Sequence, residues 1–298
     1  MNTPAALPLA PPSPAQEFVR AFASNRGALI AFFVFAAVVL GALLAPVLAP
    51  HDPVQQFREH MLTPPLWLAG GMGQFPLGTD ELGRCVLSRL LFGARVSLGI
   101  GLAAVLLAML PGVVLGLVAA FHPRWVAPLV MRLMDILLAL PGLLLAIAVI
   151  TILGPGLLNT VIAIALGALP AYVRLARASA LAEMGRDYVT ASRVAGAGTL
   201  RLMFDTVLPN CLAPLIVKAT LGFSSALLET AALGFLGLGV QAPQPEWGSM
   251  LSAARDYIER APWVVSMPGL AILSTVLSIN LMGDGLRDAL DPKLRQAS

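Results

Sequence analysis

The stretch EMGRDYVTASRVAGAGTLRLMFDTVLP, residues 183–209, decides the fold because it is a polar island between two long apolar runs. Its first part, Asp187 to Ala195, is predicted to form a short helix. Gly196 and Gly198 are predicted to end that helix, because glycine tolerates the left-handed turn that commonly closes one. The island is therefore predicted to fold into a compact knob at the membrane surface.

The second part of the island is predicted to be another short helix. Thr199 is a suitable N-cap, since its hydroxyl can accept a hydrogen bond from a backbone N–H in the first turn. The helix is expected to run toward Val207 and to end at Leu208–Pro209. An ordinary loop between membrane helices is the alternative interpretation of the same residues.

Composition indicates a membrane protein. The chain of 298 residues is 58% hydrophobic and only 12% charged, about half the charge of a soluble domain. Apolar runs of about 20 residues are long enough to cross a bilayer. We predict an all-α membrane protein with six transmembrane helices, at residues 28–48, 98–121, 129–153, 157–173, 211–228 and 264–282.

The order of these runs divides the chain into four parts. Residues 1–27 are predicted to be an N-terminal tail, and residues 28–97 the first span, an outer segment and an amphipathic helix capped by Thr79 or Asp80. Residues 98–282 form a five-helix core, with the island at about 186–207, and residues 283–298 a C-terminal tail. A cleaved signal peptide is the competing interpretation of the first run, which exceeds a typical signal core.

Basic residues predict the orientation. With six spans both termini lie on one side, and arginines concentrate in the segments facing that side, as Arg174, Arg186 and Arg201 illustrate. Cytoplasmic loops carry such an excess. The termini and the island are therefore predicted to be cytoplasmic.

Several function classes are excluded. The lysines, Lys218 and Lys293, do not follow a glycine, so the chain has no phosphate-binding GxxxxGK[ST] loop and is not predicted to be an enzyme. The net charge of +3 is too small to indicate nucleic-acid binding. The scattered histidines and Cys85 and Cys211 show no metal-binding spacing, and no metal, cofactor or disulfide is expected.

Ionisable side chains inside spans are candidate functional groups. Asp135 is predicted to pair with Arg132, three residues earlier, and Lys218 to reach toward the cytoplasmic surface. Glu229 either lines a pathway or marks the outer end of the fifth span. The loop from Gly234 to Trp247 is too rich in glycine and proline for a regular helix.

Irregular backbone near a bilayer persists only where protein covers it or where it lines a cavity. Glu246 and Trp247 in this loop are therefore candidates, with Glu229, for a pathway or gate, and a passive linker is the alternative.

The island resembles the "EAA" signature of permease subunits of bacterial binding-protein-dependent ABC importers. In that family the signature forms a coupling helix that sits in a groove of a cytoplasmic ATPase. Aligned on Leu208–Pro209, the resemblance assigns ATPase coupling to Thr190, Ala191, Ser192, Gly196, Ala197, Met203, Leu208 and Pro209. Thr190 departs from the family's usual glutamate.

Other segments extend the resemblance to most of the chain. Residues 77–99, 210–217, 232–239, 245–248 and 280–293 are similar to dipeptide and oligopeptide importer permeases, and most similar to the second permease of dipeptide systems. The resemblance implies the type I ABC importer permease fold in the bacterial cytoplasmic membrane.

The implied partners are a sister permease, two ATPase subunits that use ATP and Mg²⁺, and a periplasmic or lipid-anchored substrate-binding protein. Dipeptides or short peptides would be the substrate. Related permeases for nickel, oligopeptides, glutathione or haem are alternatives. An ATP-independent channel or secondary transporter is the alternative from another class.

Overall fold

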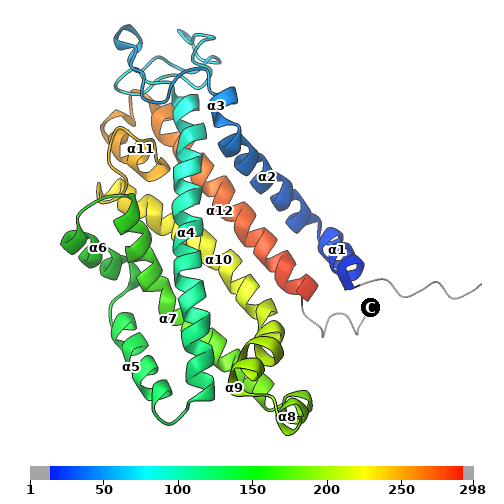
Figure 1. The fold of residues 1–298 in the computed structure, drawn as a ribbon. Coiled ribbons are helices and arrows are strands. Elements are labelled where there is room, and N and C mark those ends of the chain that lie inside the picture. Colours follow the sequence, from blue (N-terminus) through cyan, green and yellow to red (C-terminus); the bar gives the residue numbers. More distant parts are fainter. Residues whose placement is uncertain (1–13, 291–298) are drawn as a thin grey trace, which may run out of the picture.

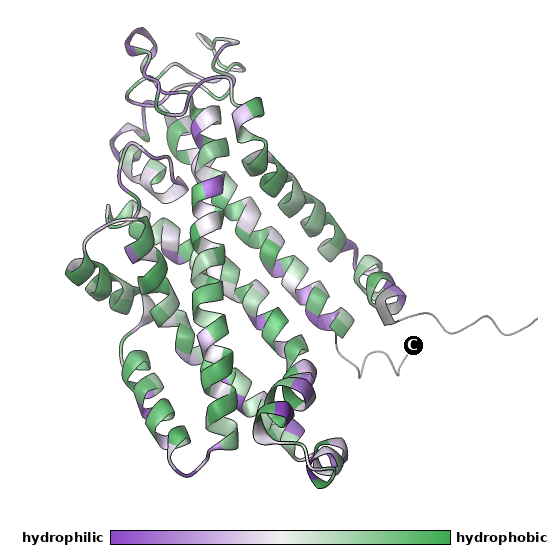
Figure 2. Ribbon diagram, in the orientation of Figure 1, coloured by the Kyte–Doolittle hydropathy of each residue, from purple (hydrophilic) through white to green (hydrophobic). Residues whose placement is uncertain are grey.

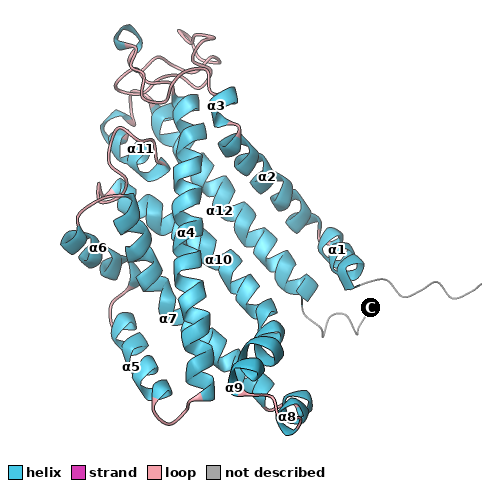
Figure 3. Cartoon of the chain, in the orientation of Figure 1, coloured by secondary structure: helices cyan, strands magenta, loops and turns pink. Residues whose placement is uncertain are grey.

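The structure, a computed structural model, describes residues 14–290, and this part of the chain is helical with no β-strand (Figures 1 and 3). The Pro-rich start and residues 291–298 of the expected tails lie outside the described residues. The α-helices are α1 (Pro14–Ser24), α2 (Arg26–Leu43), α3 (Ala45–Leu48), α4 (Val86–Phe121), α5 (Val126–Leu138), α6 (Gly142–Leu153), α7 (Leu157–Met184), α8 (Asp187–Val194), α9 (Thr199–Arg201), α10 (Leu208–Phe235), α11 (Trp247–Ala253) and α12 (Pro262–Leu290).

Apolar spans account for the architecture. Five helical stretches are long and apolar enough to cross a membrane, and a sixth results if the bent pair α5–α6 counts as one span. Figure 2 shows hydrophobic residues along these helices and hydrophilic residues concentrated toward their ends and in the outer loops. The predicted all-α membrane fold is confirmed.

The third span differs from its prediction. A single helix over 129–153 is wrong, because α5 and α6 meet at an angle of 88°. Pro141 lies in the break and lacks a backbone N–H, and a proline also disfavours helical geometry for the residue before it, here Leu140. Residues 129–153 are almost uniformly hydrophobic, so hydrophobicity did not indicate the break.

The second span also differs from its prediction. The expected amphipathic surface helix and the second span form one helix, α4, which is 36 residues or about 54 Å long. It begins at Val86, so neither Thr79 nor Asp80 is its cap. Asp80 instead closes the preceding turn, where its carboxylate accepts hydrogen bonds from the backbone N–H groups of Leu82 and Arg84.

A buried ion cluster holds the segment between α3 and α4, residues 49–85 and here called the outer segment, against α4. The Asp80 carboxylate lies 2.7 Å from Nε of Arg84 and 3.4 Å from Nε of Arg89, and the Asp80–Arg84 side chains are only 8–9% exposed. Glu81 accepts from Arg84 at 2.9 Å. Arg89 also donates to the carbonyl of Pro53. The loop is therefore fastened to the outer end of a membrane helix.

Glycines allow α4 and α7 to approach closely. A Cβ at Gly116 would lie 2.6 Å from the carbonyl oxygen of Val173, and one at Gly112 would lie 2.7 Å from Cβ of Tyr172. Small residues permit this kind of backbone contact between membrane helices, where packing replaces the hydrophobic driving force.

We expect Asp80→Ala to loosen the outer segment. The change leaves Arg84 and Arg89 buried without their shared carboxylate, and removing one partner of a buried ion pair costs about 3 kcal/mol or more. Trypsin cleavage at Arg58 in spheroplasts should accelerate at least tenfold, whereas Glu259→Ala, which removes an exposed carboxylate in the segment between α11 and α12, should have no effect. Equal cleavage of both variants would contradict this role of Asp80.

Candidate functional site

The polar island forms a knob at the end of the bundle opposite the outer loops (Figure 1). Its first helix, α8, spans Asp187–Val194 and so matches its prediction to within one residue. Gly196 has a φ of +85°, the left-handed conformation expected for it. The N–H of Ala197 donates to the carbonyl of Ser192, and the N–H of Gly196 donates to that of Arg193. These two bonds form a Schellman motif.

The second helix departs from its prediction. Gly198 occupies the N-cap position, and Thr199 is the first helical residue with no capping bond. The helix does not end at Leu208–Pro209 but passes through a π-helical segment, Leu202–Val207, directly into α10. Pro209 explains this segment, since its ring excludes a regular hydrogen bond to the carbonyl four residues earlier.

Apolar packing makes the knob rigid. Val189, Met203 and Val207 are at most 2% exposed and pack with Ala176 and Ala180 of α7. The buried cluster continues to Leu117 of α4 and to Cys211 of α10. Met203, assigned to coupling by the signature, therefore lies beneath the knob's surface, where it connects the knob to the membrane helices.

The other residues that the signature assigns to coupling lie at the solvent-facing surface of the knob or partly beneath it. Thr190, Ala191, Gly196 and Pro209 are exposed, and Ser192, Ala197 and Leu208 are half-buried. Their role in ATPase coupling stays a prediction.

Two residues that the signature did not assign are more prominent on the same knob. Val194 is 84% exposed and Leu200 is 71% exposed. Their exposed apolar side chains make them candidates for contact with a partner protein. Their signal in the sequence was an apolar residue on each side of the Gly-Ala-Gly turn.

Glu246 fastens the loop between α10 and α11 to α4. This side chain is completely buried and caps α11, where its carboxylate accepts from the N–H groups of Gly248 at 2.7 Å and Ser249 at 2.8 Å. The hydroxyl of Ser97 on α4 donates to it at 3.1 Å. Burial raises the pKa of Glu246 above its ordinary value, and these hydrogen bonds oppose that shift.

Trp247 completes this attachment. It is 2% exposed, and its indole N–H donates to the carbonyl of Leu90 at 3.1 Å. Trp247 is the first residue of α11, a helix of 7 residues. A role in a gate stays a prediction for Glu246 and Trp247. Their contacts within this chain attach α11 firmly to α4.

Asp135 pairs with a different helix from the one expected. Its carboxylate lies 2.6 Å from the guanidinium of Arg174 on α7, so the predicted partner, Arg132, is wrong. Both side chains are at least half exposed, and the pair links the first half of the broken span to α7.

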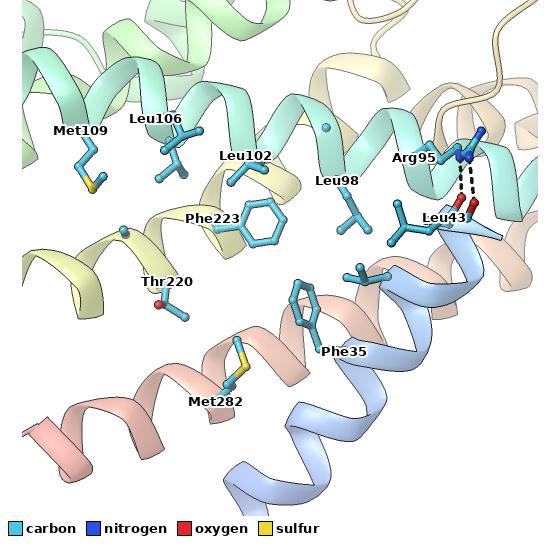
Figure 4. A pocket seen from close by; sticks show the side chains of 15 residues that line it. Phe35, Leu43, Arg95, Leu98, Leu102, Leu106, Met109, Thr220, Phe223 and Met282 are labelled. Atoms are coloured by element: carbon cyan, nitrogen blue, oxygen red, sulfur yellow. Dashed lines mark hydrogen bonds between the residues drawn. The ribbon is translucent and has the colours of Figure 1, made fainter. Parts of the chain in front are cut away.

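Glu229 lies at a cavity of about 210 Å³ between α4, α7 and α10, which is lined by both polar and apolar side chains. Lys218, Ser225 and Tyr172 also line this cavity. A second, larger groove of about 670 Å³ lies between α2, α4, α10 and α12 (Figure 4).

The larger groove offers little to a polar ligand. Its lining is almost entirely apolar, apart from Thr220 and Arg95, and the guanidinium of Arg95 donates to the carbonyls of Ala42 and Leu43 at the end of α2 (Figure 4). The smaller cavity is therefore the better candidate for contact with a polar substrate.

Comparisons with known proteins place the chain in a family. Residues 112–296 match the family described as "binding-protein-dependent transport system inner membrane component", and residues 13–65 match the "N-terminal TM domain of oligopeptide transport permease C". The chain belongs to this inner membrane component family. It is thus a permease component of a bacterial ABC importer.

Relatives resemble the permease along nearly its whole length. It is 66% identical over 298 residues to a di/tripeptide transport system permease protein of Pseudomonas aeruginosa, covering 100% of this chain and 98% of the relative. A dipeptide transport system permease protein of Escherichia coli is 54% identical over 96% of this chain and 95% of its own length. A glutathione transport system permease protein of Pectobacterium atrosepticum is 40% identical over 95% of this chain and 92% of its own length.

A solved structure supports the fold. The permease matches a chain of the MetNI methionine ABC transporter, in an inward-facing conformation, with a TM-score of 0.55 and 20% identity, covering 68% of this chain and 97% of that one. The likeness shows the type I importer permease fold.

We expect Glu246→Ala to release α11 from α4. Two backbone N–H groups and the Ser97 hydroxyl would lose their shared acceptor, and loss of such a cap costs about 1–2 kcal/mol. Amide hydrogen exchange over 247–253 in detergent micelles should become about tenfold faster. Glu259→Ala, which removes an exposed carboxylate between α11 and α12, should leave the exchange rate unchanged. Equal rates in the two variants would contradict the attachment of α11 through Glu246.

Proposed function

We propose that the permease imports dipeptides and other short peptides as one half of an ATP-driven complex. It pairs with a sister permease, two cytoplasmic ATPase subunits and a periplasmic or lipid-anchored substrate-binding protein. The observation that carries the proposal is the knob: a rigid, exposed element with apolar side chains, built on a family signature and joined without a break to a membrane helix. The names of the relatives support peptides as substrate.

The knob would transmit movement from the ATPases. ATP and Mg²⁺ bind to the ATPases, and closure of these subunits draws the knobs of the two permeases together. The segments α9, the π-helical segment and α10 form one continuous helix from Thr199 to Phe235. Displacement of the knob is therefore transmitted along α10 to the other side of the membrane. The cavity between the permeases then opens outward to receive the peptide.

An orientation in the membrane is part of the same proposal. We propose that both termini and the knob are cytoplasmic, as the arginine distribution indicates, and that residues 49–85 and α11 face the binding protein. The buried ion cluster and the attachment of α11 through Glu246 would keep that outer surface in shape during transport.

Glutathione, nickel and haem are the alternative substrates. A relative named for glutathione transport shares 40% identity, and glutathione is itself a tripeptide. Competition of glutathione, nickel and haem with labelled dipeptide in uptake assays separates these substrates. An ATP-independent mechanism is disfavoured by membership of a binding-protein-dependent family.

We expect Val194→Glu combined with Leu200→Glu to detach the ATPases. The two carboxylates would put unpaired charge into an apolar contact, which costs several kcal/mol. In affinity purification from the native host in mild detergent, the unaltered chain should bring down a second multispanning permease and P-loop ATPases. The double variant should retain the permease and lose at least nine-tenths of the ATPases.

Leu66→Glu combined with Leu68→Glu is the matched control, because it places the same two charges at exposed leucines of the outer segment. It should leave ATPase recovery unchanged. Recovery of the unaltered chain alone, without ATPases, would overturn the proposed function.

We expect Gly196→Val to uncouple ATP hydrolysis from uptake while the chain remains in the membrane. Open space surrounds Gly196, so the effect comes from its positive φ, which costs about 1–2 kcal/mol or more for a β-branched residue. Peptide uptake per ATP hydrolysed in proteoliposomes should fall at least fivefold. Asparagine tolerates this conformation, so uptake per ATP in Gly196→Asn should stay near the unaltered value. Normal uptake in Gly196→Val would refute the coupling role.

A further inference from the structure

Helix α10 presents opposite charges on one face. Lys218 and Glu229 are separated by 11 residues, about three helical turns, so their side chains leave the helix in nearly the same direction. Gly222 and Ser225 lie between them on that face, and all four line the cavity of about 210 Å³. Within residues 14–290, neither Lys218 nor Glu229 forms a salt bridge.

The broken span brings a helix end to Glu229. A Cβ placed on Gly142, the first residue of α6, would lie 3.8 Å from Oε1 of Glu229. The first backbone N–H groups of a helix have no partner within it, and they carry partial positive charge. The bend at Pro141 therefore positions a polar helix end beside the carboxylate at membrane depth.

Tyr172 supplies a second, independent indication of a ligand. This side chain of α7 is 1% exposed, and among the described residues its hydroxyl has no hydrogen-bond partner. It lines the same cavity, where a Cβ at Gly222 would clash with the hydroxyl. Buried hydroxyls nearly always have a partner, and an unsatisfied one costs about 1–3 kcal/mol. The hydroxyl is therefore a buried donor without a partner in the described part of the chain, at the wall of the cavity.

We propose that this cavity binds a short zwitterionic peptide during translocation, an inference that rests on the proposed function. Glu229 binds the terminal ammonium group, Lys218 binds the terminal carboxylate, and the hydroxyl of Tyr172 donates a hydrogen bond to a peptide carbonyl. The site recognises backbone and termini, which every peptide shares, and so suits a transporter of peptides with varied side chains.

Helix geometry gives the expected length of the peptide. Eleven residues place the Cα atoms of Lys218 and Glu229 about 16 Å apart along the helix axis. An extended chain spans about 3.5 Å per residue, so a dipeptide or tripeptide spans about 7–11 Å. The two charged side chains can close the remaining gap by leaning toward each other. A pentapeptide, at about 17 Å, matches the separation of the Cα atoms without such leaning, so helix geometry permits short peptides of two to five residues.

Uptake by the complete complex in proteoliposomes tests the assignment. Permeases, ATPases and binding protein are reconstituted, and uptake of labelled dipeptide is divided by the ATP hydrolysed. Glu229→Gln and Lys218→Gln should each lower this ratio at least tenfold, and Tyr172→Phe about threefold, while ATPase stimulation by the loaded binding protein stays within twofold. Thr220→Val changes a polar residue on the groove side of α10 and should match the unaltered complex.

Blocked peptides separate recognition of the termini from a structural role. The uptake ratio of free to N-acetylated dipeptide should fall in Glu229→Gln, and that of free to C-amidated dipeptide should fall in Lys218→Gln. Because every reaction contains the same binding protein, a changed ratio belongs to the permease. A merely structural charge would leave both ratios as they are in the unaltered complex.

The outcomes distinguish the two proposals. No ATP-dependent peptide uptake by the unaltered complex overturns the proposed function. Normal uptake by that complex, with unchanged uptake per ATP and unchanged ratios in the variants, overturns the peptide site alone. If the cavity variants lose both ATPase stimulation and peptide uptake, the peptide site is also overturned, because this result assigns the residues to folding.

Discussion

The close contact between α4 and α7 is the constraint on which the rest of the molecule depends. Gly112 and Gly116 bring the two backbones together over one stretch of the membrane. At one level of that contact lies Tyr172, which lines the cavity of about 210 Å³. Further along α7, Ala176 and Ala180 support the buried side of the knob. One packing interface therefore fixes both the candidate substrate site and the candidate coupling surface.

Helix α10 joins these regions mechanically. It continues the knob's second helix without a break, carries Lys218 and Glu229, and packs at its outer end against the loop that Glu246 holds. Gly234 and Gly248 permit that contact, since a Cβ at Gly248 would overlap the backbone of Ala231. A rod with a knob at one end and a fixed joint at the other suits a protein that converts movement on one side of a membrane into opening on the other.

Irregular elements occur where function is proposed. The π-helical segment adjoins the knob, and the bend at Pro141 brings the start of α6 to Glu229. In both places proline removes a backbone hydrogen bond that a regular helix would make. Such departures persist in a membrane only where neighbouring protein compensates for them, and here α7 and α10 provide the neighbouring surfaces.

By itself, the sequence determined the membrane class, the approximate spans and the position of the knob, because hydrophobicity, glycine and basic charge act over short stretches of chain. Only the tertiary structure decided that α4 is one helix, that α5 and α6 are bent apart, that Asp135 pairs with Arg174 and that Glu246 is a buried cap. The cavity of Lys218, Glu229 and Tyr172 belongs to the same group. Each of these depends on which side chains from distant segments meet, and nearly uniform hydrophobic helices contain little periodicity from which their contacting faces could be predicted.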